Sequence, residues 1–295
     1  MATVDVQLVL YHTDLARVER SLHALARAAA YRRDDDSHAL EITVRLGDCS
    51  AMRLLGEDIL LQWQEYFRGQ LEIEYEYFAK NLGHGGAQNR LSQGGKSDYI
   101  LFSNPDVLPQ PSAVTHLVEL LRDDPRVGIV DAKQLPLEHP KYFEPLTGLT
   151  SWCSGAFSLV RRRDFERVGG FDHETFFMYC DDVDLSWRIR LLGLDAVYQP
   201  AAVVYHSKRL DASGAVETTA SERYYSAEAA LLLARKWGAE ELLATLIQVM
   251  SDSASDDHRN ALARYRSLEH AGRLPAVTPG ASDVAEFVHG AYGKM

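Results

Sequence analysis

The sequence predicts an α/β fold with a mostly parallel central sheet, followed by a helical C-terminal region. In the first half of the 295-residue chain, short aliphatic segments with strand character alternate with segments whose apolar residues recur at helical spacing. From about residue 221 onward no segment has strand character, and three segments have helical spacing with Gly or Pro between them. We therefore expect an α/β domain over residues 1–215 and a helical region over residues 216–295.

The first five predicted strands are connected by predicted helices. Aliphatic or alternating patterns predict strands over residues 4–10, 40–46, 71–78, 99–102 and 127–130. Helical spacing predicts a first helix with Thr13 as its N-cap, a short helix after a Gly-rich turn, and helices over residues 54–67 and 111–122. Ligands of such sheets bind beyond the carboxyl ends of the strands, so functional residues are expected where strands end.

Beyond residue 152 the pattern becomes mixed α and β. Residues 155–165 predict a strand that leads into a short helix, and residues 196–198 and 203–205 predict two more strands. The apolar residues of segment 183–191 alternate as in a strand. We nevertheless favour a helix there, because acidic residues precede the segment and Gly193 follows it.

The charge of the chain argues against a nucleic-acid binder. The formal net charge is −11, and no basic run is longer than residues 161–163, whereas nucleic-acid binders carry a basic stripe. No apolar run approaches the ~20 residues of a membrane span, and the N-terminus lacks a signal-peptide pattern. The three widely spaced cysteines indicate neither a disulfide framework nor a zinc site. We expect a cytoplasmic protein with reduced thiols.

Three aspartates, Asp181, Asp182 and Asp184, follow an aromatic run and precede the predicted helix. Their repulsion must be offset by solvent, a helix N-terminus, arginines or a metal, because an unpaired buried carboxylate is costly. One interpretation is structural: Asp181 or Asp182 caps the helix, and Asp184 pairs with Arg188 four residues on. The spacing alone does not decide between this interpretation and a functional one.

Polar residues also follow two predicted strands. Asn104 and Asp106 come directly after the strand at 99–102, where an Asx-turn would explain them, but Asp106 is also an oxygen ligand suited to Mg²⁺ or Mn²⁺ on a diphosphate. His206 ends the last predicted strand and is a candidate second ligand. Lys208 and Arg209 follow it and could neutralise phosphate charge.

The Gly-rich turn NLGHGGAQN, residues 81–89, would let a phosphate approach the backbone at the start of the next helix. Such a turn is a weak signal by itself. The first predicted strand is followed by LYHTDLAR and not by the GxGxxG pattern of nicotinamide-dinucleotide enzymes, so that class lacks its motif.

Taken in order, these segments resemble the family 2 glycosyltransferases, nucleotide-sugar-dependent enzymes of the GT-A fold, over about residues 4–209. The resemblance lies in YH after the first strand, the NLGHGGAQN turn (NxGxxxxxN in the family), YILFSNPDV, and the long segment 155–206. The NPD, GGFD, FFMY and DDVDLSWR sequences are most similar to rhamnosyltransferase-like members that build bacterial polysaccharides. The resemblance implies a Rossmann-like, GT-A-type transferase domain over residues 1–215.

The resemblance also implies roles for individual residues. It implies a Mn²⁺ or Mg²⁺ site at Asp106 and His206, with Asn104 where many relatives have the first acid of a DxD motif. It implies that Asp182 is the catalytic base and that Asp181 supports it in place of a Glu. The implied donor-binding residues are Tyr11, Asp48, Asn81, Gly83, Asn104, Asp106, Lys208 and Arg209. Trp152 and Phe177 could stack on acceptor sugars, as could Phe176 and Trp187, although a core position is the commoner one for such residues.

One loop departs from the family pattern. Residues 45–50, RLGDCS, stand where the family commonly has VDNAS, whose acid binds the nucleobase. When the two are aligned at Ser50, Gly47 takes the place of the acid and Asp48 that of the Asn. Either Asp48 binds the base from a shifted loop, or other groups recognise the base.

The implied reaction is inverting transfer by single displacement, in which Asp182 accepts the proton of the acceptor hydroxyl and a metal stabilises the departing diphosphate. We rank dTDP-rhamnose first as donor and UDP-sugars second, and we expect a growing or lipid-linked glycan acceptor at the inner face of the cell membrane. The C-terminal helices could form a homodimer, rest on the membrane surface or pack on the domain. Their apolar faces leave all three roles open.

Two other classes remain alternatives. A sugar nucleotidyltransferase would need a Gly-rich loop with Arg and Lys after the first strand, and YHTDLARVER is not such a loop. A degenerate, non-catalytic nucleotide-sugar-binding protein is favoured by Gly47 and Asn104. The presence of Asp106, Asp182 and His206 argues against it.

Overall fold

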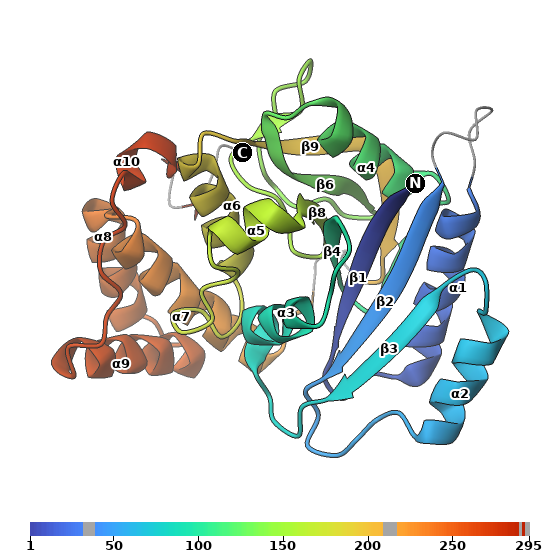
Figure 1. Cartoon of the computed structure of the whole chain (residues 1–295). Helices are drawn as coiled ribbons and strands as arrows, with labels where there is room; N and C mark the ends of the chain where they lie inside the picture. The colour runs from blue at the N-terminus through green and yellow to red at the C-terminus, as the bar shows by residue number, and fades with distance from the viewer. Residues whose placement is uncertain (32–38, 209–216, 289–290, 293–295) are drawn as a thin grey trace.

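The computed structural model describes residues 1–31, 39–208, 217–288 and 291–292. Within these ranges a nine-stranded sheet runs in the order β3-β2-β1-β4-β8-β6-β9-β5, and β7 pairs with β9. Helices lie on both sides of this sheet (Figure 1). The alternating pattern of the sequence therefore predicted the α/β class correctly.

The first half of the sheet is parallel. It contains β1 (Ala2–Leu10), α1 (Leu15–Ala30), β2 (Leu40–Asp48), α2 (Glu57–Tyr66), β3 (Glu72–Tyr77), α3 (Gly83–Gln93) and β4 (Tyr99–Ser103). Strand β1 pairs in parallel with β2 and β4, and β2 pairs in parallel with β3. The carboxyl ends of all four strands therefore meet at one edge, and their buried Val, Leu and Ile side chains are typical of a sheet covered on both faces.

The second half of the sheet is mixed. It contains β5 (Val107–Pro109), α4 (Ala113–Asp123), β6 (Val127–Leu135), β7 (Leu149–Thr150), β8 (Phe157–Arg161), α5 (Arg162–Arg167), α6 (Asp181–Leu191) and β9 (Asp195–His206). Strand β8 runs antiparallel between β4 and β6, whereas β9 is parallel to β6. Because β8 begins where β4 ends, the residues before β8 lie at the carboxyl edge, where Asn104 N–H donates to the Ala156 carbonyl at 3.0 Å.

Strand β9 is one strand of 12 residues, although the sequence pattern predicted two. Its pairing with β6 shifts register between Ala132 and Lys133, opposite the stretch from Gln199 to Val203. Pro200 lies in that stretch and has no N–H to donate to the ladder. The shift interrupts the alternation of side chains, which is why the pattern looked like two strands.

Two helix starts differ from the prediction. Asp14, and not Thr13, caps α1, because its carboxylate accepts the Ala16 N–H at 3.0 Å while the Thr13 hydroxyl accepts the Tyr11 N–H. The N-cap of α6 is Cys180, which has a left-handed φ of 54° and makes no side-chain cap bond. Capping by Asp181 or Asp182 therefore does not explain the acidic segment.

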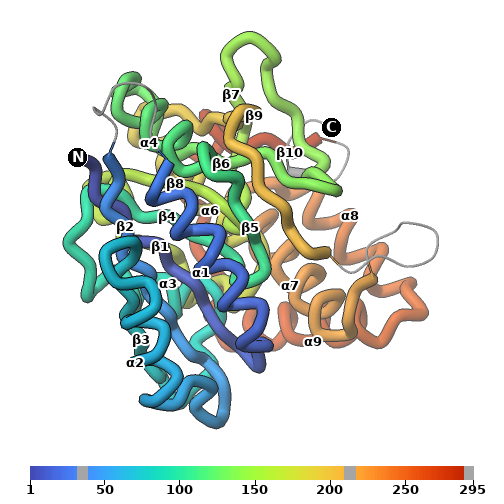
Figure 2. The backbone as a smooth tube through the Cα atoms, turned by 90° about the vertical axis from the view of Figure 1, so that its right-hand side faces the viewer, coloured from blue at the N-terminus to red at the C-terminus, as the bar shows by residue number. Residues whose placement is uncertain are grey.

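The C-terminal helices pack on the α/β part of the chain. They are α7 (Ala220–Lys236), α8 (Glu240–Ser251) and α9 (Asp256–His270), and they lie on the opposite side of the molecule from α2 (Figures 1 and 2). Phe176 and Trp187 share a buried cluster with Leu231 and Trp237. Of the three roles open for these helices, packing on the domain is therefore observed.

The last described residues form a helix α10 (Ala281–Val284) and two strands, β10 (Phe287–Val288) and β11 (Ala291–Tyr292), that pair antiparallel. The sequence predicted no strand in this region, and strands of two residues are too short to show a periodicity. Arg190 of α6 donates to the Val284 carbonyl at 2.7 Å, which joins this end to the α/β part. None of the described helices is long and apolar enough to cross a membrane.

Candidate active site

Two strand ends bring the predicted metal ligands together. Asn104 and Asp106 follow β4, and β5 pairs with β9 so that Val107 lies opposite His206. The Asp106 Oδ1 lies 3.6 Å from His206 Nε2, and the Asn104 amide nitrogen lies 3.4 Å from the same ring atom. The predicted ligands, which follow two different strands, therefore lie next to one another.

The hydrogen bonds of His206 define which ring nitrogen carries the proton. Its Nδ1 lies 2.9 Å from Gln134 Oε1, and since a carbonyl oxygen only accepts, the proton is on Nδ1. The Nε2 lone pair then faces Asp106. Burial lowers the pKa of His206, the Asp106 charge opposes this effect and Lys208 adds to it, and the net shift is downward.

This donor set fits Mn²⁺ or Mg²⁺ in part. A neutral imidazole and a carboxylate are accepted ligands, and such ions usually take their remaining ligands from substrate phosphates and water. Among the described residues no group of three or more His, Cys, Asp or Glu side chains could hold a metal alone. Asp106 and His206 would therefore hold such an ion only if oxygens of a bound diphosphate completed the set.

Two cationic side chains border the cluster. The Lys208 Nζ donates to the Leu137 carbonyl at 3.1 Å, and burial lowers the pKa of this lysine. Arg17 on α1 lies 4.0 Å from Asp106 Oδ2 and is 45% exposed. No sequence pattern indicated Arg17, because a single Arg on a helix gives no signal of its distant partner. Arg209, the other predicted cation, lies outside the described residues.

The Gly-rich turn is used for packing and not as an open phosphate cradle. The Gly83 N–H donates to Asn81 Oδ1 at 3.1 Å, and the His84 N–H donates to the Phe177 carbonyl at 3.0 Å. Gly83 has a φ of 72°, and a Cβ there would lie 2.3 Å from the same carbonyl oxygen. The first two N–H groups of the helix are therefore occupied by protein acceptors, in contrast to the phosphate-cradle interpretation.

Asp48 lies at the end of β2 but points into the protein. It is fully buried, and its carboxylate accepts hydrogen bonds from the Ser50 N–H at 2.9 Å, the Leu54 N–H at 2.8 Å and the Tyr75 hydroxyl at 2.6 Å. Direct contact of this carboxylate with a nucleobase does not agree with these bonds. The hydrogen bonds of Asp48 instead hold the loop after β2. Tyr11, another predicted donor-binding residue, follows β1 and is 52% exposed.

The acidic segment forms a pair with the Gly-rich turn. The Asp181 Oδ2 lies 2.6 Å from His84 Nδ1. Burial lowers the pKa of His84, but the charge and hydrogen bond of Asp181 and the charge of Asp182 outweigh it, so the net shift is upward. No sequence pattern indicated His84 as a partner of the acidic segment, because Asp181 is 97 residues away.

Asp182 is held by backbone donors. Its Oδ2 accepts the Gly155 N–H at 2.9 Å, and its Oδ1 accepts the Val183 N–H at 2.9 Å. Burial and the neighbouring Asp181 raise the pKa of Asp182 to about 6, against the lowering by these N–H groups and by His84. A carboxyl group of this pKa is ionised at neutral pH and is a stronger base than an exposed aspartate.

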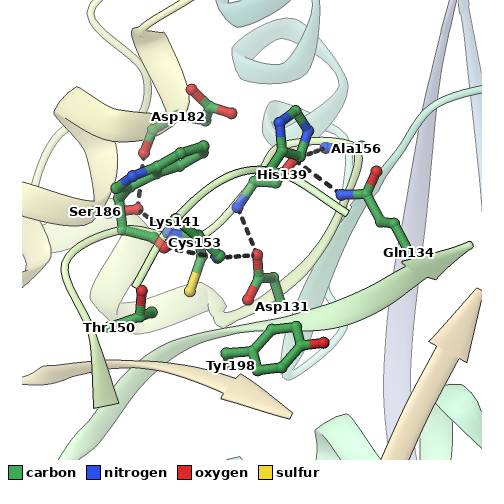
Figure 3. Close-up of polar contacts among 12 residues, drawn as sticks. Asp131, Gln134, His139, Lys141, Thr150, Cys153, Ala156, Asp182, Ser186 and Tyr198 are labelled. Atoms are coloured by element: carbon green, nitrogen blue, oxygen red, sulfur yellow. Dashed lines mark hydrogen bonds and ion pairs between the residues drawn. The ribbon is translucent and has the colours of Figure 1, made fainter. Parts of the chain in front are cut away.

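A buried ion pair between Lys141 and Asp131 holds the segment that carries Gly155 (Figure 3). The Lys141 Nζ lies 2.5 Å from Asp131 Oδ2 and donates to the Trp152 carbonyl at 2.8 Å. The Ser154 N–H donates to the same Asp131 oxygen at 2.8 Å. This pair thereby fixes the backbone that presents the Gly155 N–H to Asp182.

The remaining predicted residues divide between structural and open positions. Asp184 pairs with Arg188 at 2.7 Å, as predicted, and also with Lys236 of α7 at 2.6 Å. Trp152 is 5% exposed, which does not agree with stacking on an acceptor sugar. Phe177 is partly exposed and lies 4.9 Å from the Tyr225 ring. Phe176 and Trp187 are core residues.

Comparison with known proteins relates part of this chain to a known domain family. Residues 56–184 match the glycosyl transferase family 2 domain. The chain is 31% identical over 174 residues to the N-acetylglucosaminyl-diphospho-decaprenol L-rhamnosyltransferase of Mycobacterium tuberculosis, which covers 43% of this chain and 56% of that protein. It is 30% identical over 138 residues to the rhamnosyltransferase WbbL of Escherichia coli, which covers 37% of this chain and 52% of that protein. The chain thus spans about half the length of these curated relatives.

Solved structures share the fold. A mannosyltransferase from Pyrobaculum calidifontis in complex with GDP-Man and Mn²⁺ has a TM-score of 0.58 at 19% identity, over 90% of this chain and 80% of that one. GalNAc-T7 with UDP, GalNAc and Mn²⁺ has a TM-score of 0.64 at 12% identity, over 94% of this chain and 56% of that one. The chain therefore has a GT-A-like fold, and its residues 56–184 match the glycosyl transferase family 2 domain.

Proposed function

We propose that this chain transfers a sugar from a nucleotide-diphosphate donor to an acceptor hydroxyl, with inversion at the anomeric carbon. The observation that supports this proposal most strongly is Asp182, a partly buried carboxylate whose pKa is raised to about 6 and which is held by the Gly155 N–H. The next residue, Ala156, accepts the Asn104 N–H. The base and the Asn104–Asp106 turn therefore border the same short segment.

Asp182 acts as the base in this proposal. The acceptor oxygen forms a bond to the anomeric carbon while the bond from that carbon to the diphosphate oxygen breaks, and the hydroxyl proton moves to Asp182. The two N–H groups on the carboxylate fix its orientation, which general-base catalysis requires. Because the displacement is single, no covalent sugar–enzyme intermediate forms.

The opposite side of the site stabilises the leaving group. Asp106 and His206 would hold Mn²⁺ or Mg²⁺, which supplies positive charge to the diphosphate when it is bound. Arg17 and Lys208 border the same cluster and add positive charge of their own. Asn81, Gly83 and Asp48 act indirectly, since their polar groups hold the loops around the donor.

For the donor we propose dTDP-rhamnose first and a UDP-sugar second. Two curated relatives carry rhamnosyltransferase in their names, and one of these names also contains a lipid diphosphate linked to N-acetylglucosamine. We therefore propose a lipid-linked or growing glycan as acceptor. In this proposal residues 1–215 perform the transfer, and residues 216–295 support the loop before α6.

The competing candidate is a non-catalytic nucleotide-sugar-binding protein. It is favoured by the inward-pointing Asp48 and by Asn104, which leaves the turn after β4 with one carboxylate. Transfer remains the better proposal, because a binding protein has no need of a carboxylate with a raised pKa beside the donor site.

Turnover and binding with a panel of donors separate these candidates. The chain is incubated with Mn²⁺, dTDP-rhamnose or UDP-sugars, and an N-acetylglucosaminyl diphosphate lipid as acceptor, and the released nucleotide is measured. We expect turnover with at least one donor. Binding without turnover would favour the non-catalytic candidate, and neither binding nor turnover with any donor would contradict both.

A further inference from the structure

His84 connects the Gly-rich turn to the acidic segment in a way that the proposed reaction has not used. Its Nδ1 lies 2.6 Å from Asp181 Oδ2, and the two side chains are 21% and 4% exposed. The His84 ring also lies edge-on to the Phe171 ring, with 5.4 Å between their centres. The NxGxxxxxN pattern leaves this position unspecified, so His84 belongs to this chain and not to the pattern.

Asp182 lies on another side of the same histidine. A Cβ at Gly155 would be 3.2 Å from His84 Cε1 and 3.4 Å from the Asp182 Cβ, so the absent side chain of Gly155 lets the two groups approach. Among the described residues, the charged groups that act on His84 are Asp181 and Asp182, both on α6. Its other neighbours, Phe171 from the loop before α6 and Gln88 from its own helix, carry no charge. The Gln88 amide nitrogen lies 3.4 Å from His84 Nε2, and a 180° turn of this amide places its oxygen there as the acceptor that an imidazolium requires.

The charge on His84 determines whether both Asp181 and Asp182 can be ionised. Two adjacent carboxylates in a partly buried position tend to share one proton, because the second charge has no compensation. A base that is protonated cannot accept the acceptor proton. An imidazolium in contact with Asp181 forms a neutral pair, and Asp182 can then ionise beside it.

We propose that His84 is a positioning residue for the base: as an imidazolium paired with Asp181, it keeps Asp182 ionised and available to the acceptor hydroxyl. This inference rests on the proposed function. The transferred proton still goes to Asp182, and His84 keeps its own proton throughout.

The first test needs no turnover. The ring C–H signals of His84 are followed by NMR against pH in the wild-type chain and in Asp181→Asn. We expect His84 to remain protonated at pH 7 in the wild type and to lose its proton at lower pH in the variant, while the signals of the other histidines are unchanged. A neutral wild-type His84 at pH 7 would overturn the inference, even if the chain transfers sugar.

The second test uses the pH profile of kcat/KM. In His84→Asn the acid limb should move to higher pH by about one unit, with most of the rate regained at pH 9, because the carboxylate pair has lost its cation. His84→Lys, which restores a positive charge, should move the limb back, and His270→Asn on the exposed end of α9 serves as control. A loss of kcat/KM in His84→Asn that is the same at every pH would indicate a merely structural role of His84 and would contradict the inference.

Protein that fails to fold is recognised by circular dichroism, and in that case His84→Gln replaces His84→Asn in the same measurement. The two proposals fail differently. Absence of turnover with every donor, together with a protonated His84 at pH 7, would contradict the proposed function alone. Turnover with an unshifted acid limb in the variant would contradict the role of His84 alone.

Discussion

Two pairs of titratable side chains near the carboxyl edge of the sheet differ in how far their charges are compensated. Lys141 and Asp131 are 2.5 Å apart and 2% and 1% exposed, so each charge is compensated by the other. Asp106 and His206 are 3.6 Å apart and 22% and 12% exposed, and the proton of the imidazole is directed away from Asp106, toward Gln134. The first pair balances its charges without a ligand, although Asp131 Oδ1 has no hydrogen-bond partner among the described residues, whereas the second leaves a carboxylate next to an imidazole lone pair. We interpret the first pair as structural support and the second as a binding site.

The largest effect on stability should come from breaking the buried Lys141–Asp131 pair. Lys141→Met leaves the Asp131 charge buried without its partner, and we expect a loss of about 3–5 kcal/mol in the free energy of unfolding by urea denaturation. The double variant Lys141→Met with Asp131→Asn should recover more than half of this loss. Lys133→Met on the exposed face of β6 is the control. A loss below about 1 kcal/mol in the single variant would contradict the structural interpretation.

Breaking the Asp106–His206 pair should instead affect turnover. Asp106→Asn removes the carboxylate ligand while it keeps the shape, and we expect turnover to fall by about 100-fold or more with little change in unfolding free energy. Chelation by EDTA should cause a similar loss in the wild type, and Mn²⁺ should reverse it. Full activity of the wild type in EDTA would show that Asp106 and His206 do not hold a metal.

A smaller effect is expected from the residue that orients His206. Gln134→Leu removes the acceptor of the Nδ1 proton, and the apparent affinity for Mn²⁺ should fall by about 10- to 100-fold. Gln134 also donates to the Ser154 hydroxyl at 3.2 Å, so Ser154→Ala controls for that contact. If the two variants lower the apparent affinity for Mn²⁺ equally, the effect of Gln134→Leu does not act through His206.

The smallest expected effect concerns the pH dependence of stability. Asp182 ionises near 3.8 in the unfolded chain and near about 6 in the folded one, so the folded state binds an extra proton between these values. Stability is therefore lost as the pH rises through this window. This difference between the two pKa values corresponds to at most about 3 kcal/mol, and solvent screening of the partly exposed carboxylate reduces it. Asp182→Asn removes the loss and should be more stable than the wild type by about 1 kcal/mol at pH 8, with no gain at pH 3. Equal stability of both proteins at pH 8 would contradict the raised pKa.

The parts of the fold and site that depend on local pattern were predictable. Strand alternation predicted the sheet, and strand ends predicted the Asp106–His206 cluster, because parallel strands align their carboxyl ends. The Asp184–Arg188 pair followed from its spacing of four residues on a helix. Each of these predictions requires only neighbours in sequence or a rule of topology.

Features that depend on distant packing could not be predicted. His84 meets Asp181 only because α3 packs on the loop before α6. Asp48 is held inward by Tyr75 of the neighbouring strand in addition to the Ser50 and Leu54 N–H groups. The left-handed Cys180 removes the side-chain cap that the acidic segment seemed to offer. No periodicity in the sequence reports such contacts.

The rate of Asp182→Asn tests the central claim most directly. With the best donor and Mn²⁺, we expect kcat to fall by at least about 100-fold relative to the wild type, while the KM for the donor changes little, because the amide keeps the shape but cannot accept the proton. Asp256→Asn, whose side chain is 85% exposed on α9, should keep the wild-type rate. A near-normal kcat in Asp182→Asn would show that Asp182 is not the base and would contradict the account.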